Sequence, residues 1–257
     1  MVGIALTDLW TLAALGIVGT VAGFVDSIAG GGGLLTIPAL VWAGLSPAQA
    51  LATNKLQGSF GTASASLTFV RKGAVDPRAF VPAIIATFIA AALGATLVQR
   101  VDPGVLRTLI PILLLGAAAF FAFTPNAGKI QAPRRLSETT YAGTVAPVIG
   151  FYDGFFGPGT GSFMVLSQVT LCGRAMTEAT GYAKVLNFTS NIASLLFFLA
   201  GGKIVWSAGL AMAVGQFAGA RLGAHLVIAR GAAIVRPLLV GISVVIALRL
   251  LYVAYGA

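Results

Sequence analysis

The chain has 257 residues, of which 58% are hydrophobic and only 9% are charged, with a formal net charge of +9. Soluble domains are about a quarter charged, so this composition excludes an ordinary soluble domain and predicts a membrane protein. The basic residues stand singly or in pairs between apolar stretches, which is typical of membrane-flanking anchors and not of a nucleic-acid surface.

Apolar stretches recur along the whole chain. Because a helix needs about 20 apolar residues to cross the hydrocarbon, the sequence predicts an all-α polytopic membrane protein with about eight transmembrane helices. The expected spans are residues 7–27, 47–70, 78–99, 104–123, 140–156, 177–200, 204–228 and 232–254. The first stretch lacks a basic region and carries Asp8, so we expect it to be a span and not a cleavable signal.

A run of glycines interrupts the first apolar stretch. Residues 23–38 read GFVDSIAGGGGLLTIP, so an apolar helix runs into Asp26, four glycines and a second short apolar segment. The backbone groups that the glycines free must pair with protein, ligand or water. We therefore expect the break to line a cavity, where Gly31, Gly32 and Gly33 offer a small anion the positive end of a helix dipole.

A second break has the same layout at residues 150–166, GFYDGFFGPGTGSFMVL. Two interrupted segments at corresponding places in two halves are the best sequence-level indication of a transporter binding site. The aspartate before this break is Asp153, and the binding residues expected after it are Gly159, Thr160, Gly161 and Ser162.

Matched residues indicate that the chain contains two copies of one unit. The offset of 184 − 55 = 129 positions relates Lys55 to Lys184, Gly73 to Gly202, Gly94 to Gly223, and Arg107 to Arg236. We expect repeat 1 at residues 1–123, a linker at 124–139 and repeat 2 at 140–257. Four spans in each copy would make the repeats parallel, an odd number would invert them, and a re-entrant break would change the count.

Each copy carries a row of small residues in its third span. The rows are Ala86, Ala90 and Gly94 in the first copy, and Gly215, Gly219 and Gly223 in the second. Small residues at this spacing let another backbone approach closely. We expect internal packing there, with a homodimer seam as the alternative.

Polar side chains lie at the starts of the second and sixth spans, where lipid would reject them. Lys55 and Lys184 lie on the order of 10 Å inside their spans, and a lysine at that depth marks a site unless it is paired or snorkels outward. Together with amides and hydroxyls on the same helices, they predict a pocket for a small oxyanion. The expected binding residues here are Thr53, Asn54, Lys55, Gln57, Lys184, Asn187 and Asn191.

The two aspartates leave several interpretations open. Lys55 and Lys184 could form structural ion pairs with Asp26 and Asp153 that close the two breaks, or they could be released when substrate binds. The aspartates could cap the segments that follow, or could couple transport to H⁺ or Na⁺.

Arg221 and His225 lie one turn apart in the seventh span, where their repeat counterparts are Ala92 and Thr96. They are interpreted as a snorkelling arginine with a packed histidine, or as a proton relay or accessory anion contact.

In an eight-span arrangement, the basic residues of the loops favour cytoplasmic termini only slightly.

Four segments together resemble the TauE/SafE family of membrane transporters, and within it the YfcA-like branch. They are GFVDSIAGGGGLLTIPAL, ALATNKLQGSFGTASA, GFYDGFFGPGTGSF and ATGYAKVLNFTSNIASLLFFLAGGKIVW. The resemblance spans nearly the whole chain and implies a bacterial inner-membrane transporter formed by duplication of a four-helix unit. It also implies that sulfite, thiosulfate, sulfonates or related organic anions are the substrates, often exported. Its glycine-rich motifs fall on residues 26–36 and 153–162, and its polar helix motifs on 53–62 and 180–191.

The sequence therefore predicts a secondary transporter of a small anion, working by alternating access in the bacterial inner membrane. No ATP-binding loop is found, so an ion gradient or the gradient of the substrate must supply the energy. One cysteine, Cys172, and one histidine argue against a metal centre, and no cofactor is expected. An intramembrane enzyme or a membrane assembly factor is the alternative, although an enzyme would need a catalytic group beyond Asp26 and Asp153.

Overall fold

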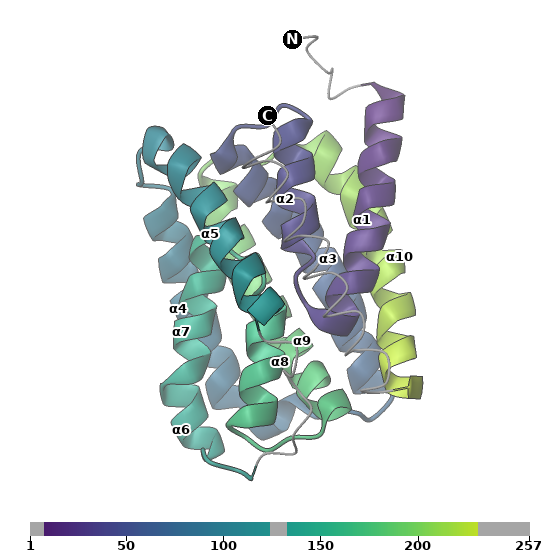
Figure 1. Ribbon diagram of the computed structural model, residues 1–257, viewed down its shortest axis with the longest axis vertical. Coiled ribbons are helices and arrows are strands. Elements are labelled where there is room, and N and C mark those ends of the chain that lie inside the picture. Colours follow the sequence, from purple (N-terminus) through teal and green to yellow (C-terminus); the bar gives the residue numbers. More distant parts are fainter. Residues whose placement is uncertain (1–7, 124–132, 231–257) are drawn as a thin grey trace.

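The computed structural model describes residues 8–123 and 133–230, and its regular structure there is helical (Figure 1). The first half contains α1 (Leu9–Ala29), α2 (Gly33–Trp42), α3 (Pro47–Arg71), a 3-10 turn (Pro77–Phe80), α4 (Val81–Val98) and α5 (Pro103–Phe123). The second half contains α6 (Glu138–Gly143), α7 (Val145–Phe155), α8 (Thr160–Thr170), α9 (Met176–Ala200) and α10 (Trp206–Arg230). The expected span 232–254 and Arg236 lie outside the described residues.

The start of α3 follows from its sequence. The Ser46 side chain accepts a hydrogen bond from the Gln49 amide, the Gln49 side chain accepts one from the Ser46 amide, and Pro47 occupies the first turn. This reciprocal cap satisfies backbone donors that the helix itself leaves free. It fixes the register of the polar residues that follow on α3.

Helix α1 runs parallel to α10, and the two pack at very close range. A Cβ placed on Gly16 of α1 would lie 3.4 Å from the Ala211 carbonyl of α10, and further along, one on Gly223 of α10 would collide with Ser27 of α1. Gly215 and Gly219 lie equally close to α1, and Gly94 of α4 lies against α7. The internal packing expected for the two rows of small residues is therefore confirmed for Gly94, Gly215, Gly219 and Gly223.

Helices α1 and α2 form a hairpin whose outer ends lie on one side of the molecule (Figure 1). Like α1, α3 runs parallel to α10, because Thr53 accepts a hydrogen bond from the Val205 amide and Ser64 donates one to the Phe217 carbonyl. Since α1 and α3 share a direction, the short helix between them runs back toward the side from which α1 came. The first broken helix therefore turns around at its break and does not continue through the molecule.

The second half is built the same way but points the other way. Helix α7 is parallel to α4, because their contacts advance along both helices in the same direction. A Cβ on Gly150 of α7 would lie 2.9 Å from the Thr87 carbonyl of α4, and Phe155, later in α7, lies against Gly94, later in α4. Helices α7 and α8 form the second hairpin (Figure 1). Helices α3 and α9 are antiparallel, since Gly58 approaches Asn191 whereas Phe69, later in α3, approaches Gly181, earlier in α9.

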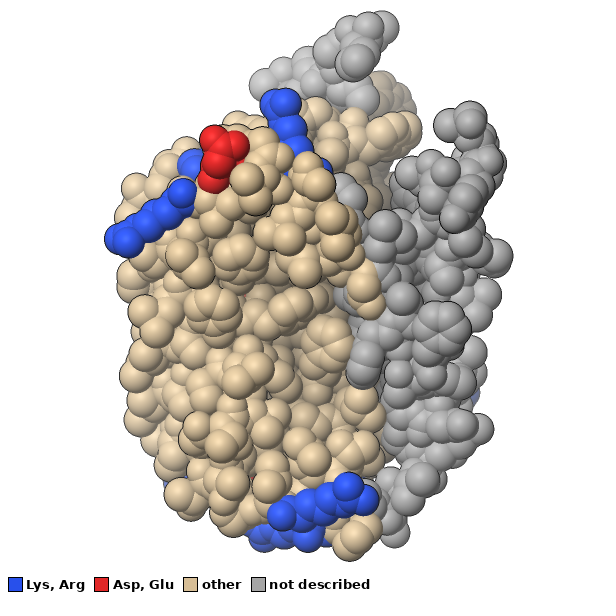
Figure 2. Space-filling model, turned by 60° about the vertical axis from the view of Figure 1, so that its left-hand side comes forward, with Lys and Arg blue, Asp and Glu red and all other residues tan. Residues whose placement is uncertain are grey.

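Within the described residues, four helical segments are long and apolar enough to cross a membrane: Leu9–Ala29, Pro77–Val98, Met176–Ala200 and Trp206–Arg230. Large apolar side chains such as Leu93, Val214 and Leu222 are more than half exposed. On the face shown in Figure 2, the charged side chains of the described residues gather at the two ends, and the described part of the band between them carries none. These features define a multi-pass membrane protein.

Buried apolar side chains form two clusters, and polar side chains lie between them. One cluster contains Phe69, Tyr141 and Met164, and the other contains Leu51 and Phe198. Along α3, the polar residues from Asn54 to Thr62 separate the two clusters. The middle of the molecule is therefore polar, although it is deeply buried.

Candidate functional site

The two helix breaks contact each other at the centre of the molecule. The Ser162 hydroxyl donates a hydrogen bond to the Ala29 carbonyl, and a Cβ on Gly30 would collide with the Ser162 backbone. The break residues Gly30 and Gly159 have φ values of 78° and 87°, a region that glycine adopts without steric cost. The glycines therefore allow both the turns and the close approach.

A polar cavity lies beside this contact. The space open to the centre of a water-sized sphere is about 30 Å³, which is enough for about two waters or a group of similar size. Its lining comes from both hairpins and from three long helices: Asp26, Gly31, Gly32, Gly33, Asn54, Gln57, Gly58, Thr62, Asp153, Gly157, Gly159, Thr160, Gly161, Asn187, Asn191 and Gln216.

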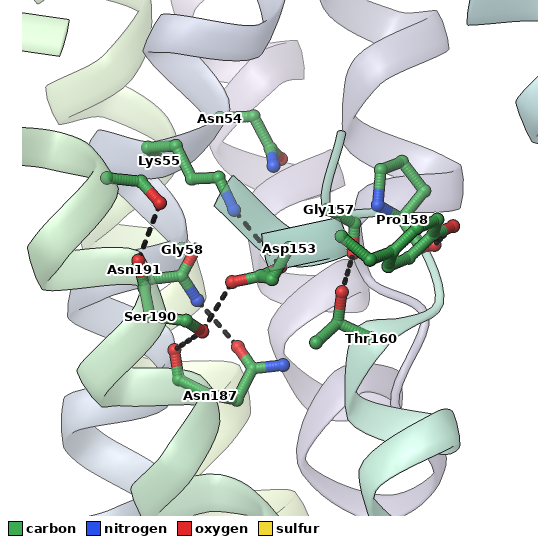
Figure 3. A network of polar contacts seen from close by, with 12 residues as sticks. Asn54, Lys55, Gly58, Asp153, Gly157, Pro158, Thr160, Asn187, Ser190 and Asn191 are labelled. Atoms are coloured by element: carbon green, nitrogen blue, oxygen red, sulfur yellow. Dashed lines mark hydrogen bonds and ion pairs between the residues drawn. The ribbon is translucent and has the colours of Figure 1, made fainter. Parts of the chain in front are cut away.

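Two buried ion pairs link the halves of the chain. Lys55 Nζ of α3 lies 3.0 Å from Asp153 Oδ1 of α7, and Lys184 Nζ of α9 lies 3.0 Å from Asp26 Oδ2 of α1. Figure 3 shows the Lys55 pair. The ion pairs considered as an alternative from the sequence are thus present, and each joins a lysine of one half to an aspartate of the other. The four charges sum to zero.

Each aspartate also has a second partner. Asp26 Oδ1 accepts a hydrogen bond from the Gly32 amide at the start of α2, over 3.1 Å. Ser190 donates its hydroxyl hydrogen to Asp153 Oδ2 (Figure 3). The Asp26 side chain is 18% exposed whereas that of Asp153 is 3% exposed, so the Asp26 carboxylate is the more accessible of the two.

The two lysines lie directly behind glycines of the cavity wall. A Cβ on Gly157 would lie 3.0 Å from Lys55 Nζ, and one on Gly161 would lie 3.1 Å from Lys184 Nζ. Both glycines line the cavity. The absence of side chains at these positions therefore brings both ammonium groups close to any solute in the cavity.

Two side-chain amides of the cavity, those of Asn54 and Asn187, keep a donor for a solute, whereas the Gln57 Oε1 acceptor has no hydrogen-bond partner among the described residues. Asn54 Oδ1 accepts hydrogen bonds from the Thr36 hydroxyl and from Gln57 Nε2, each over 2.6 Å, and Asn187 Oδ1 accepts one from Asn191 Nδ2 over 2.6 Å. Because these amide oxygens are occupied within the protein, the Nδ2 groups of Asn54 and Asn187 are the parts that remain for a solute. Donors of this kind suit an anion.

Most of the predicted site residues meet at this cavity, and some lie elsewhere. Thr53 and Ser162 hold the backbones of neighbouring segments and do not line it. Arg221 and His225 line a separate groove between α3 and α10.

The sequence interpretation missed Gln216 of α10, along with Gly58, Thr62 and Gly157, as lining residues. A buried glutamine inside an apolar span was the available signal for the first of these.

These features define a class of multi-pass helical membrane proteins in which two broken helices meet at a buried polar centre. Residues 15–250 match the family described as "Sulfite exporter TauE/SafE", and the chain belongs to this family. No solved structure matches the chain.

Several bacterial proteins are similar over almost their full length. The chain is 48% identical over 245 residues to "Probable membrane transporter protein YfcA" of Escherichia coli K12, and this alignment covers 95% of this chain and 91% of that protein. It is 47% identical over 241 residues to a "Probable membrane transporter protein" of Haemophilus influenzae, with 94% of each chain covered. It is 26% identical over 238 residues to "Probable membrane transporter protein YunE" of Bacillus subtilis, with 82% of this chain and 86% of that protein covered.

Proposed function

We propose that this protein is a secondary transporter of a small anion in the bacterial inner membrane, with a sulfur oxyanion or organosulfonate as its cargo. Sulfite, thiosulfate and sulfoacetate are the cargoes to test first, with export as the expected direction. The observation that carries the proposal is the polar cavity where both helix breaks meet. The family description and the names of the bacterial relatives support transport as the activity.

The anion binds where the lysines and the amide donors converge. In the resting cavity, Lys55 and Lys184 are neutralised by Asp153 and Asp26. An oxyanion next to Gly161 takes over the ammonium of Lys184 from its carboxylate and receives hydrogen bonds from the amide of Asn187. A buried ammonium without a partner is strongly unfavourable, so release of the aspartate and arrival of the anion are expected to occur together.

The two halves act as inverted repeats, residues 1–123 and 140–257. In this proposal each hairpin enters and leaves the membrane on one side, which leaves α3, α4 and α5 to cross in the first half, and α9, α10 and the span expected from the sequence at 232–254 in the second. An odd number inverts one repeat relative to the other, which agrees with the antiparallel directions of α3 and α9. Transport then proceeds by alternating access, as one half rocks against the other around the cavity.

The end of the molecule that carries the C-terminus of α3 faces the cytoplasm. The described Lys and Arg residues at this end are Arg71, Lys72, Arg78, Arg134, Arg135, Arg174, Arg221 and Arg230, against Arg100, Arg107 and Lys203 at the opposite end. Cytoplasmic loops carry the excess of basic residues. The sequence favours cytoplasmic termini only slightly; in this proposal the start of α1 faces away from the cytoplasm, because it lies at the end with fewer basic residues.

Ion coupling is assigned to the carboxylates of the two breaks. Asp26 borders the cavity and is the more exposed of the two aspartates. It is therefore the first candidate to bind H⁺ or Na⁺ when the ammonium of Lys184 pairs with the substrate. A protonated or sodium-bound Asp26 would no longer compete with the anion for Lys184. This would couple binding of the ion to binding of the cargo.

A ligand screen tests the proposal. Thermal unfolding of the purified protein in detergent is measured with sulfite, thiosulfate, sulfoacetate, taurine, sulfate, lactate and phosphate. We expect stabilisation by one sulfur oxyanion or sulfonate, and no response from the folded, charge-neutral variant Asp26→Asn/Lys184→Gln. If no anion stabilises the folded wild-type protein, the proposed anion site is wrong.

A further inference from the structure

A second, basic groove lies between α3 and α10, apart from the central cavity. The groove has a volume of about 230 Å³, against about 30 Å³ for the central cavity. Four basic residues line it: Arg71 and Lys72 at the end of α3, and Arg221 and His225 on α10. Two large apolar side chains, Leu67 and Phe217, complete its outer wall and are 44% and 41% exposed.

The basic side chains of this groove have no acidic partner in the part of the chain that the structure describes. None of them belongs to a described ion pair, and the lining contains no Asp or Glu. Arg71 and Lys72 lie at a helix end, where basic residues are common. Arg221 lies more than two turns before the end of α10, so the helix end does not account for its position.

The fold does not require these charges, because the other half of the chain builds the same helix pair without them. At the offset of 129 positions, Arg71 and Lys72 correspond to Ala200 and Gly201, while Arg221 and His225 correspond to Ala92 and Thr96. In that pair, Gln99, directly after α4, donates a hydrogen bond to the Phe197 carbonyl of α9. Of these two helix pairs, α3 with α10 carries the four basic residues, and α9 with α4 does not.

The groove is separate from the central cavity in this structure. The Ser64 hydroxyl of α3 donates a hydrogen bond to the Phe217 carbonyl of α10, over 2.8 Å. No described residue lines both the groove and the central cavity. The groove opens instead toward the outer surface, where Leu67 and Phe217 are exposed.

We propose that this groove binds the phosphate of an anionic phospholipid. The guanidinium groups of Arg71 and Arg221 match a phosphate that keeps a negative charge. Leu67 and Phe217 lie on the side of the groove nearer the middle of α3 and α10, where the acyl chains of a bound lipid would run. A basic pocket between membrane helices near one membrane surface is suited to such head groups.

The test uses the full-length protein in detergent micelles with added phosphatidylglycerol or phosphatidylcholine, and bound lipid is counted by native mass spectrometry. We expect wild-type protein to retain phosphatidylglycerol preferentially. The variant Arg71→Gln/Arg221→Gln should bind it about thirtyfold more weakly, because it removes two basic residues that each contribute a factor of about five near the membrane surface. The matched control, Arg100→Gln/Lys203→Gln, removes the same charge at the opposite end and should bind as the wild type does.

Three results would overturn the proposal. One is equal retention of the two lipids by the wild type. Another is an equal loss in the control variant, which would indicate a general charge effect. The third is displacement of phosphatidylglycerol by inorganic phosphate at the same concentration, which would indicate a site for a free anion and not for a lipid.

Discussion

Lys184 on α9 holds Asp26 at the end of α1 across the two halves of the chain, with 3.0 Å between Nζ and Oδ2. The reciprocal contact, from Lys55 to Asp153, has the same length. The halves are therefore locked together by their own breaks, at the place where the cavity lies. Any motion that separates the halves must break at least one of these pairs.

The first prediction concerns the stability of the Lys184 pair. Lys184→Gln should lower the free energy of unfolding by about 3–5 kcal/mol, because it leaves a buried carboxylate without its partner. The double variant Asp26→Asn/Lys184→Gln should recover most of this loss, since it removes both charges. Chemical unfolding in detergent measures the difference. A double variant that is as unstable as Lys184→Gln would show that the ion pair does not act as a unit.

The second prediction concerns the contact between the breaks. Gly30 and Gly202 both have positive φ, at 78° and 62°, but only Gly30 has another backbone within contact distance of an added Cβ. Gly202→Ala should therefore cost only the left-handed conformation, about 1–2 kcal/mol. Gly30→Ala should cost about 1–3 kcal/mol more, because it also pushes the breaks apart and because the ψ of 175° at Gly30 lies outside the left-handed helical region. Equal melting temperatures for the two variants would contradict the close approach.

The breaks themselves could be predicted from the sequence, whereas their direction could not. Four glycines after Asp26 indicate an interruption whatever surrounds them. Hydropathy does not distinguish a helix that crosses the membrane from one that turns back, because both are apolar. That the chain turns back after α1 and after α7 becomes visible only from the packing of α1 against α10 and of α7 against α4.

The pairing of the site residues was also only partly predictable. Buried lysines and aspartates in a membrane chain must find each other, so ion pairs could be foreseen. Which lysine reaches which aspartate depends on how the halves pack, and the sequence does not encode that in any local pattern. Gln216 was missed because its repeat counterpart is Thr87, so the repeat pattern did not draw attention to it.

The third prediction concerns topology. In an eight-span arrangement, Lys72 and Lys203 would lie on the same side of the membrane, whereas the hairpins place them at opposite ends. In a Cys172→Ser background, an impermeant maleimide added to intact cells should label Lys203→Cys and leave Lys72→Cys unlabelled until the cells are opened. The same behaviour at both positions, whether both are labelled from outside or both only after the cells are opened, would rule out the inverted arrangement.

The fourth prediction concerns Gln216. Gln216→Met keeps the volume of the side chain but removes its hydrogen-bonding amide from the cavity wall. The affinity for the transported anion should fall about tenfold, the value of one good hydrogen bond. Thr87→Val is the matched control, because Thr87 is buried at the corresponding position outside the cavity lining. It should leave the affinity unchanged, as measured by calorimetry with the anion from the screen. Equal losses in the two variants would remove Gln216 from the site.

Transport by purified protein tests the central claim most directly. The protein is reconstituted into liposomes, and flux of the stabilising anion is measured for the wild type and for Asp26→Asn/Lys184→Gln. We predict saturable flux with the wild-type protein and flux at the level of empty liposomes with the variant. Equal flux through both proteins, or no flux through a folded wild type that binds the anion, would contradict an anion transporter built around these ion pairs.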